Sequence, residues 1–252
     1  MNKKVNKVNQ ILVLAGLDPQ GSAGISADIL AINNAGSFAL PIITNLTAQN
    51  TNQVFAINPI ASDIIIKQFD AINHDSEINC IKIGLITQGN LRAIEYIFNH
   101  TKNIKIILDP IIKSSTNDDL GNIKLIKKLL KNVFLLTPNS KELELLTGET
   151  DQQKAVEKLQ IPWTLITQTD TSTKIIIHKL FKNNTLIKEF EYKKLTGNYH
   201  GSGCVLSASI AGKINDLTVE MACKYGLKYT YQSLLNPLKI GKMQFTPNQI
   251  KQ

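Results

Sequence analysis

Short apolar runs alternate with segments of helical period along almost the whole chain, and this alternation limits the fold more than any other feature. Residues 11–15, 80–83 and 105–108 have the length and apolar content of buried strands. Residues 22–35 and 61–72 repeat apolar side chains every three to four positions, as amphipathic helices do. Repeated strand–helix–strand order with short connections predicts an α/β fold, in which helices cover both faces of a mostly parallel sheet.

The remaining segments continue the same pattern. Further strands are predicted at 40–46, 54–57, 133–136 and 163–167, and a hairpin at 174–178 and 185–192 around Lys182-Asn183-Asn184. Further helices are predicted at 90–99, 123–130, 141–146, 203–214 and 218–235. Because neither a linker nor an internal repeat interrupts the pattern, we expect one domain over residues 1–252, with a loosely packed tail after about residue 237.

Composition excludes several classes of protein. The net charge is +8, but the lysines are scattered and no basic run is interleaved with aromatics, so we expect no nucleic-acid partner. Residues 11–15 are too short for a signal peptide, and no run approaches the ~20 apolar residues of a membrane span. The 3 cysteines are widely spaced, without a CxxC pair, which favours reduced thiols in a cytoplasmic protein.

A glycine loop late in the chain is the strongest candidate for a functional site. Gly201-Ser202-Gly203-Cys204 leads into a segment of small residues that we expect to be helical. The free amides and the dipole at the start of a helix suit a phosphate. The same position is expected to lower the pKa of the Cys204 thiol. An ordinary helix start with a buried, unreactive cysteine fits this stretch equally well.

Other polar clusters follow predicted strands directly. They are Gly16-Leu17-Asp18, Gly84, Asp109-Pro110 and Thr137-Pro138-Asn139. Ligands of parallel sheets bind beyond the carboxyl ends of the strands, where such clusters meet. Neither GxxxxGK(S/T) nor GxGxxG occurs, so a P-loop kinase and a dinucleotide-binding motif are both excluded.

Four stretches together carry a resemblance to a known family. They are residues 15–28, close to the pattern AG-x-DPSGGAGI-x-AD; residues 46–51, close to TAQNT; Asp109-Pro110 with residues 137–142; and residues 200–204, close to HGTGC. The sequence resembles the hydroxymethylpyrimidine and phosphomethylpyrimidine kinases of thiamine biosynthesis, within the ribokinase-like superfamily. The resemblance implies a three-layer α/β/α fold with a small β flap, and ATP-dependent phosphorylation of the pyrimidine and then of its monophosphate.

The resemblance also implies roles for individual residues. Cys204 would take the proton of the substrate hydroxymethyl group, and the amides of Gly201, Ser202 and Gly203 would hold the transferring phosphoryl group. Asp109 and Glu142 would position Mg²⁺, a cation that prefers oxygen ligands. Asn139 and Thr167 would contact ATP. A turn residue at Asn139 and an acid in the first helical turn at Glu142 remain open as structural alternatives.

The acceptor pocket is implied by the earlier motifs. Gln49 would read the pyrimidine, because one amide offers both a donor and an acceptor. The other residues implied to line the pocket are Gly16, Asp18, Ala23, Leu85 and Ile111. Asp28 matches the opening motif but also fits a solvated helix residue.

Two departures from the family pattern bear on function. Residues 167–170 stand where the family has Lys-Gly-Gly-His, so the lysine that reaches the ATP phosphates is missing. We predict that Lys113 compensates in part, because its loop follows Asp109 at the same sheet edge. Ser22 also replaces the second glycine of the opening motif.

Alternative functions remain open at this point. A pyridoxal or pyridoxine kinase is the nearest, and the missing lysine motivates a non-catalytic small-molecule binder. The expected partners are a small pyrimidine substrate, ATP and a second copy of the chain in a homodimer, with no membrane.

Overall fold

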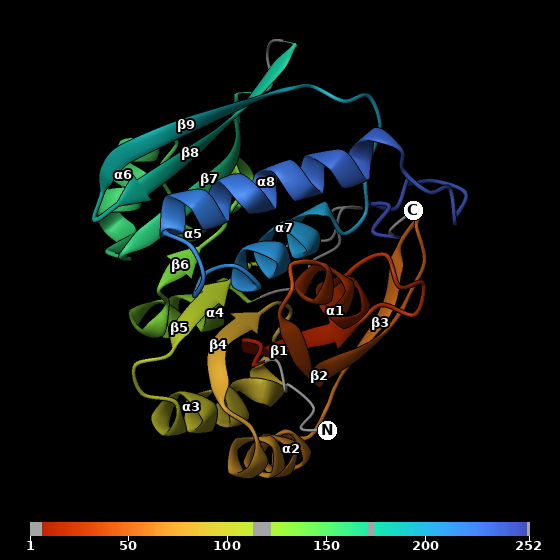
Figure 1. The fold of residues 1–252 in the computed structure, drawn as a ribbon, viewed down its shortest axis with the longest axis vertical. Helices are drawn as coiled ribbons and strands as arrows, with labels where there is room; N and C mark the ends of the chain where they lie inside the picture. The colour runs from red at the N-terminus through yellow and green to blue at the C-terminus, as the bar shows by residue number, and fades with distance from the viewer. Residues whose placement is uncertain (1–6, 113–121, 171–173, 251–252) are drawn as a thin grey trace, which may run out of the picture.

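Across the residues that the computed structural model describes, 7–112, 122–170 and 174–250, the strands form one 9-stranded sheet (Figure 1). They are β1 (Gln10–Leu17), β2 (Phe38–Gln49), β3 (Val54–Pro59), β4 (Ile78–Ile83), β5 (Lys105–Leu108), β6 (Leu135–Leu136), β7 (Trp163–Asp170), β8 (Ile175–Lys182) and β9 (Thr185–Lys193). Their order in the sheet is β3-β2-β1-β4-β5-β6-β7-β8-β9.

The middle of the sheet is parallel and its edges are antiparallel. Each neighbouring pair from β2 to β7 is parallel, while β3 pairs with β2, and β8 with β7 and β9, in antiparallel fashion. At both ends of the sheet the chain turns back from one strand to the next without an intervening helix. In the turn between β8 and β9, Asn183 and Asn184 take the positive φ angles that a tight hairpin needs. The predicted mostly parallel sheet is confirmed.

Helices cover both faces of this sheet. They are α1 (Gly24–Asn34), α2 (Ser62–Asp75), α3 (Leu91–His100), α4 (Ile123–Leu129), α5 (Ser140–Thr147), α6 (Gln152–Leu159), α7 (Ser202–Ala211) and α8 (Val219–Leu235). Helices α1, α7 and α8 lie together on the face towards the viewer of Figure 1. Helices α2 to α6 pack on the other face. Successive residues of β1 serve the two cores in turn, since Ile11 and Val13 belong to one core and Leu12 and Leu14 to the other.

The structure differs from the sequence-based expectations in two elements. Helix α6 was not predicted from the sequence. Its N-cap is Asp151, whose side chain accepts from the Lys154 amide. The helix is short and follows α5 closely in the sequence, so its few apolar residues did not indicate a separate helix. The tail after about residue 237 is not loosely packed over the described residues up to 250. Gln244, Thr246 and Gln249 are all buried.

The order of the strands places a crevice at the carboxyl edge of the sheet. From β1 the chain proceeds outward to β2 and β3, and it then returns to place β4 on the opposite side of β1. Connections on either side of this point diverge, which leaves room for a ligand beyond Gly16 of β1 and Gly84 after β4. None of the helices in the described part of the chain has the length and apolar content needed to cross a bilayer.

A buried ion pair joins the sheet to α1 beneath this crevice. Lys82 on β4 donates to Asp28 on α1, with 2.7 Å between Nζ and Oδ2, and both side chains are fully buried. The solvated alternative for Asp28 is therefore wrong. Burial raises the pKa of Asp28 to about 6 although Lys82 opposes the rise. Burial acts to lower the pKa of Lys82, but the hydrogen bond to Asp28 and the charges of Asp28 and Asp109 raise it above its ordinary value, so the amine stays charged.

Removing the lysine alone should destabilise the protein strongly. We expect Lys82→Met to lower the free energy of unfolding by about 3–5 kcal/mol, because it leaves a buried carboxyl group without its counter-ion. The measurement is urea unfolding at pH 7. The double variant Lys82→Met/Asp28→Leu serves as the control and should recover much of the loss. A single variant as stable as the wild type would contradict the importance of the pair.

Candidate active site

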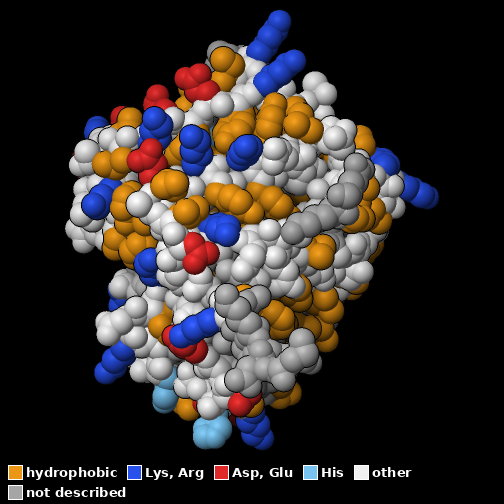
Figure 2. All heavy atoms as spheres, in the orientation of Figure 1, with side chains coloured by type: hydrophobic (Ala, Val, Ile, Leu, Met, Phe, Trp, Pro, Cys, Tyr) orange, Lys and Arg blue, Asp and Glu red, His pale blue; other side chains and the backbone are white. Residues whose placement is uncertain are grey.

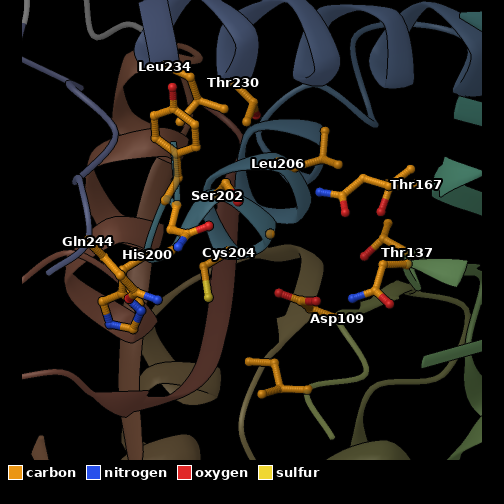
Figure 3. A pocket seen from close by; sticks show the side chains of 18 of the residues that line it. Asp109, Thr137, Thr167, His200, Ser202, Cys204, Leu206, Thr230, Leu234 and Gln244 are labelled. Atoms are coloured by element: carbon orange, nitrogen blue, oxygen red, sulfur yellow. The ribbon is translucent and has the colours of Figure 1, made fainter. Parts of the chain in front are cut away.

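A cavity of about 730 Å³ opens at the carboxyl edge of the sheet. Figure 3 shows side chains from segments far apart in the sequence converging on it, with Asp109, Cys204 and His200 close to one another. The predicted site residues that line it are Gly16, Asp18, Ala23, Gln49, Leu85, Asp109, Ile111, Asn139, Glu142, Thr167, Gly201, Ser202, Gly203 and Cys204. Lys113, the remaining predicted residue, lies outside the described residues. The cavity brings the others together, while their individual roles stay predictions.

The catalytic loop, Gly201–Cys204, depends on one glycine for its shape. Gly201 has φ +89° and is the N-cap of α7, so the loop turns where an L side chain is disfavoured. A Cβ on Gly201 would lie 1.9 Å from the carbonyl oxygen of Ser22. Gly203, in contrast, has helical geometry, and a Cβ there would lie 3.8 Å from both carboxylate oxygens of Asp109. Gly201 is therefore needed for the turn, whereas Gly203 keeps space open above Asp109.

Asp18 connects the opening loop, Asp18–Gly24, to the segment that precedes the catalytic loop. Its carboxylate accepts from the amides of Gln20 at 2.9 Å and Ala23 at 3.0 Å, and pairs with Nε2 of His200 at 3.0 Å. Burial acts to raise the pKa of Asp18, but the hydrogen bonds from His200 and the main chain hold it below its usual value. An ionised, buried carboxylate therefore joins two segments 182 positions apart.

Cys204 is buried in the floor of the cavity near three charged groups. Burial raises the pKa of its thiol to about 12; Lys82 opposes the rise, while Asp109 and Asp28 add to it. The predicted lowering of this pKa is therefore wrong, because desolvation outweighs the field of the helix terminus. The charge of Asp109 acts on the Cys204 thiol, so a carboxylate neighbours its proton. In Figure 3 the Cys204 side chain lies beside that carboxylate.

Asp109, Asn139 and Glu142 form an acidic wall opposite the catalytic loop. Asn139 and Glu142 cap α5 reciprocally, since each side chain accepts from the main-chain amide of the other at 2.9 Å. Burial and, after it, the charge of Asp109 raise the pKa of Glu142 to about 8. Burial also raises the pKa of Asp109. The structural alternative for Asn139 and Glu142 thus holds, and both side chains still line the cavity.

This acidic wall fits a magnesium ion. Glu142 holds a proton more tightly because it is buried beside the charge of Asp109, and a hard divalent cation can take the place of that proton among the carboxyl oxygens. Asp109 and Glu142 are the side chains that would hold it, directly or through water.

The residues at the far end of the cavity were not predicted from the sequence. Tyr192 on β9 lies with its ring 4.9 Å from that of Tyr231 on α8 and 5.8 Å from that of His178 on β8. Burial lowers the pKa of His178 to about 4, so this ring is neutral at pH 7. Apolar side chains that complete this end are Ile176, Leu227 and Leu234. Alternation along β9 could have placed Tyr192 on a buried face, but the contact with Tyr231 depends on how α8 packs.

Comparison with known proteins settles the family. A family model described as phosphomethylpyrimidine kinase matches residues 18–248. The chain belongs to this kinase family. The hydroxymethylpyrimidine/phosphomethylpyrimidine kinase of Aquifex aeolicus is 29% identical over 247 residues, which cover 92% of this chain and 96% of that protein.

Solved structures of related kinases share the fold. The phosphomethylpyrimidine kinase of Clostridium difficile 630 aligns with a TM-score of 0.72 at 24% identity, over 90% of this kinase and 99% of that chain. The pyridoxal kinase of Staphylococcus aureus in complex with AMP-PCP and pyridoxal aligns with a TM-score of 0.82 at 17% identity, over 96% and 94% of the two chains. The predicted family and the predicted ribokinase-like fold class are both confirmed.

The conformation of the catalytic loop yields a stability test. We expect Gly201→Ala to lower the free energy of unfolding by at least about 3 kcal/mol, since it combines backbone strain with a clash against the Ser22 carbonyl. Gly148→Ala is the matched control: Gly148 has φ +73° with nothing within 4 Å of a Cβ, and should cost about 1 kcal/mol. Denaturant unfolding measures both. Equal losses of unfolding free energy in the two variants would contradict a close contact between Gly201 and the Ser22 carbonyl.

Proposed function

We propose that this kinase transfers the γ-phosphoryl group of ATP to 4-amino-5-hydroxymethyl-2-methylpyrimidine, and then phosphorylates the monophosphate in the same cavity. The observation that carries the proposal is the meeting of the Cys204 thiol, the Asp109 carboxylate and the Gln49 amide in one cavity. The family match and the names of the relatives in thiamine biosynthesis support the pyrimidine as acceptor.

Gln49 would hold the acceptor at the flap end of the cavity. It lies at the end of β2, where the sheet turns into β3, and is only partly exposed. Its amide offers a donor and an acceptor to the aminopyrimidine edge. Apolar surface on the opposite side would come from Leu85 and Ile111, beside the open backbone at Gly16.

The catalytic loop would stabilise the transfer itself. The hydroxymethyl oxygen attacks the γ-phosphorus, a new P–O bond forms, and the bond to the bridging oxygen of ADP breaks. The amides of Gly201, Ser202 and Gly203 would hold the equatorial oxygens, where negative charge is spread in the transition state. Mg²⁺ at Asp109 and Glu142 would neutralise phosphate charge when bound.

Cys204 would receive the hydroxyl proton as part of a relay. Its high pKa means that the thiol already carries a proton at pH 7. The neighbouring Asp109 carboxylate would supply the exit: the thiol passes its own proton to that carboxylate as the sulfur accepts the proton of the substrate. Burial raises the pKa of Asp109, which makes this carboxylate a better acceptor than an exposed one.

The aromatic end of the cavity would take the nucleoside of ATP. Tyr192 and Tyr231 offer ring faces to a base, and the neutral His178 adds a third ring without a charge to desolvate. Lys193, the last residue of β9, and Lys194, which follows it, also line the cavity. We assign these two lysines to the polyphosphate, in place of the cation missing from residues 167–170.

The cellular location and the oligomeric state of the enzyme are part of the same proposal. A cytoplasmic location is supported by the use of ATP and by Cys80, Cys204 and Cys223, which are all free thiols. A homodimer is supported by large apolar side chains left exposed at the β2–β3 edge, among them Leu46 and Phe55.

The activity is tested with the purified protein and MgATP, offering the hydroxymethylpyrimidine or pyridoxal and analysing phosphorylated products. We expect Cys204→Ala to lower kcat by about 10²–10⁴-fold with little change in substrate binding. Cys223→Ala is the matched control, because Cys223 is equally buried but lies on α8 outside the cavity. Full activity of Cys204→Ala would refute the relay, and exclusive use of pyridoxal would refute the pyrimidine assignment.

The lysine assignment is tested by charge removal. Lys193→Ala/Lys194→Ala should raise KM for ATP by about tenfold or more, because charged hydrogen bonds to phosphate are worth about 1.5–3 kcal/mol. The control Lys188→Ala removes one positive charge from β9 outside the cavity and should leave KM for ATP unchanged. Lys113→Ala belongs in the same series, and an unchanged KM and kcat in that variant would reject the predicted role of Lys113.

A further inference from the structure

The described carboxyl-terminal residues fold back on themselves beside the active site. Leu238 and Thr246 exchange two main-chain hydrogen bonds, each of 2.9 Å. We call residues 238–246 the C-terminal hairpin. Within the hairpin, the ammonium of Lys239 donates to the carbonyl of Met243 at 2.9 Å and lies 4.7 Å from the centre of the Phe245 ring. The hairpin is therefore an ordered element with its own internal contacts.

The hairpin pins the main chain immediately before the catalytic loop. The amide of Phe245 donates to the carbonyl of Asn198, and the amide of His200 donates to the carbonyl of Phe245, both at 2.9 Å. These bonds bracket Tyr199 on both sides. The Phe245 ring also lies 3.3 Å from where a Cβ on Gly197 would stand. The C-terminal hairpin thus holds the segment that leads into Gly201.

The hairpin also holds the opening loop that the catalytic loop crosses. Thr246 and Ser22 share a hydrogen bond of 2.6 Å between their hydroxyl groups, and both residues are almost fully buried. The carbonyl of Ser22 is the atom that packs against Gly201. The Ser22 hydroxyl, which is absent from the glycine of the family motif, therefore has a structural partner in the hairpin.

A third set of contacts joins the hairpin to the end of the cavity where Gln49 lies. The amide of Met243 donates to the hydroxyl of Thr51 at 3.3 Å, and a Cβ on Gly241 would lie 2.3 Å from the same hydroxyl oxygen. Thr51 is buried and follows Gln49 by two residues. Gln244, also buried, forms part of the cavity wall, and Figure 3 shows it next to His200.

We propose that the C-terminal hairpin is a positioning element of the active site, which holds the opening loop, the entry to the catalytic loop and the end of the Gln49 strand in one fixed arrangement. The inference rests on the proposed function. A phosphoryl group is stabilised only by donors at the correct distance, so a loop displaced by about 1 Å can lose up to about 10²-fold in rate. The hairpin touches no reacting atom and acts through the loops that it contacts.

The experiment is a double-mutant cycle on the buried hydroxyl pair. Ser22→Ala and Thr246→Val each remove the 2.6 Å bond, and each should lower kcat about tenfold while KM for ATP changes less than threefold. The double variant should resemble the single variants, because both remove one shared interaction. Hydrogen exchange of residues 197–204, measured by mass spectrometry, should become faster in all three.

Ser37→Ala is the matched control. Ser37 is buried and donates to the carbonyl of Gly212 at 2.7 Å, far from the cavity, so its loss should lower stability but leave kcat and the exchange of residues 197–204 unchanged. An equal fall of kcat in Ser37→Ala, or wild-type kcat in the cycle variants, would overturn the proposal. If the wild type phosphorylates neither acceptor, the proposed function fails, and unchanged exchange of residues 197–204 in the variants would then overturn the positioning role separately.

Discussion

The active site depends on one close crossing, in which the catalytic loop passes over the opening loop with Gly201 against the carbonyl of Ser22. No side chain fits between them, since a Cβ would lie 1.9 Å from that oxygen. The Asp18–His200 pair fixes the crossing on one side, at 3.0 Å. This contact brings the end of β1 and the start of α7 to the same point, so that Asp18 and Cys204 line one cavity.

The charges around the crossing are arranged so that the buried polar groups support one another. Lys82 and Asp28 form a pair beneath the cavity, and the ammonium also acts on Cys204 and Asp109. One cation is thus shared by several acidic groups, and Asp109 and Glu142 hold protons more tightly than exposed carboxyl groups do. In the proposed mechanism a metal ion would take the place of those protons, and the amides of the catalytic loop would stabilise the phosphoryl oxygens.

The sequence predicted most of the fold because its parallel strands are continuous apolar runs and its turns carry Gly, Pro and Asn. It also located the cavity residues, since polar clusters at strand ends share one edge of the sheet. The errors were of a different kind. A solvated Asp28 remained open as an alternative, and the pKa of Cys204 was expected to be lowered, because burial by α1 and the sheet leaves no mark in the local sequence. The contact of Tyr192 with Tyr231 and the packed C-terminal hairpin depend on segments far apart in the chain.

The distribution of groups in the cavity explains how one site can serve two acceptors. In the proposed site a neutral hydroxymethylpyrimidine would be held by shape and by the Gln49 amide, whereas its monophosphate brings an additional negative charge. The cavity is lined both by the carboxyl groups of Asp109 and Glu142 and by the main chain of the catalytic loop. An acceptor phosphate directed to the amides of that loop would meet donors instead of carboxylates, so the presence of both kinds of group, more than the size of the cavity, would permit the second transfer.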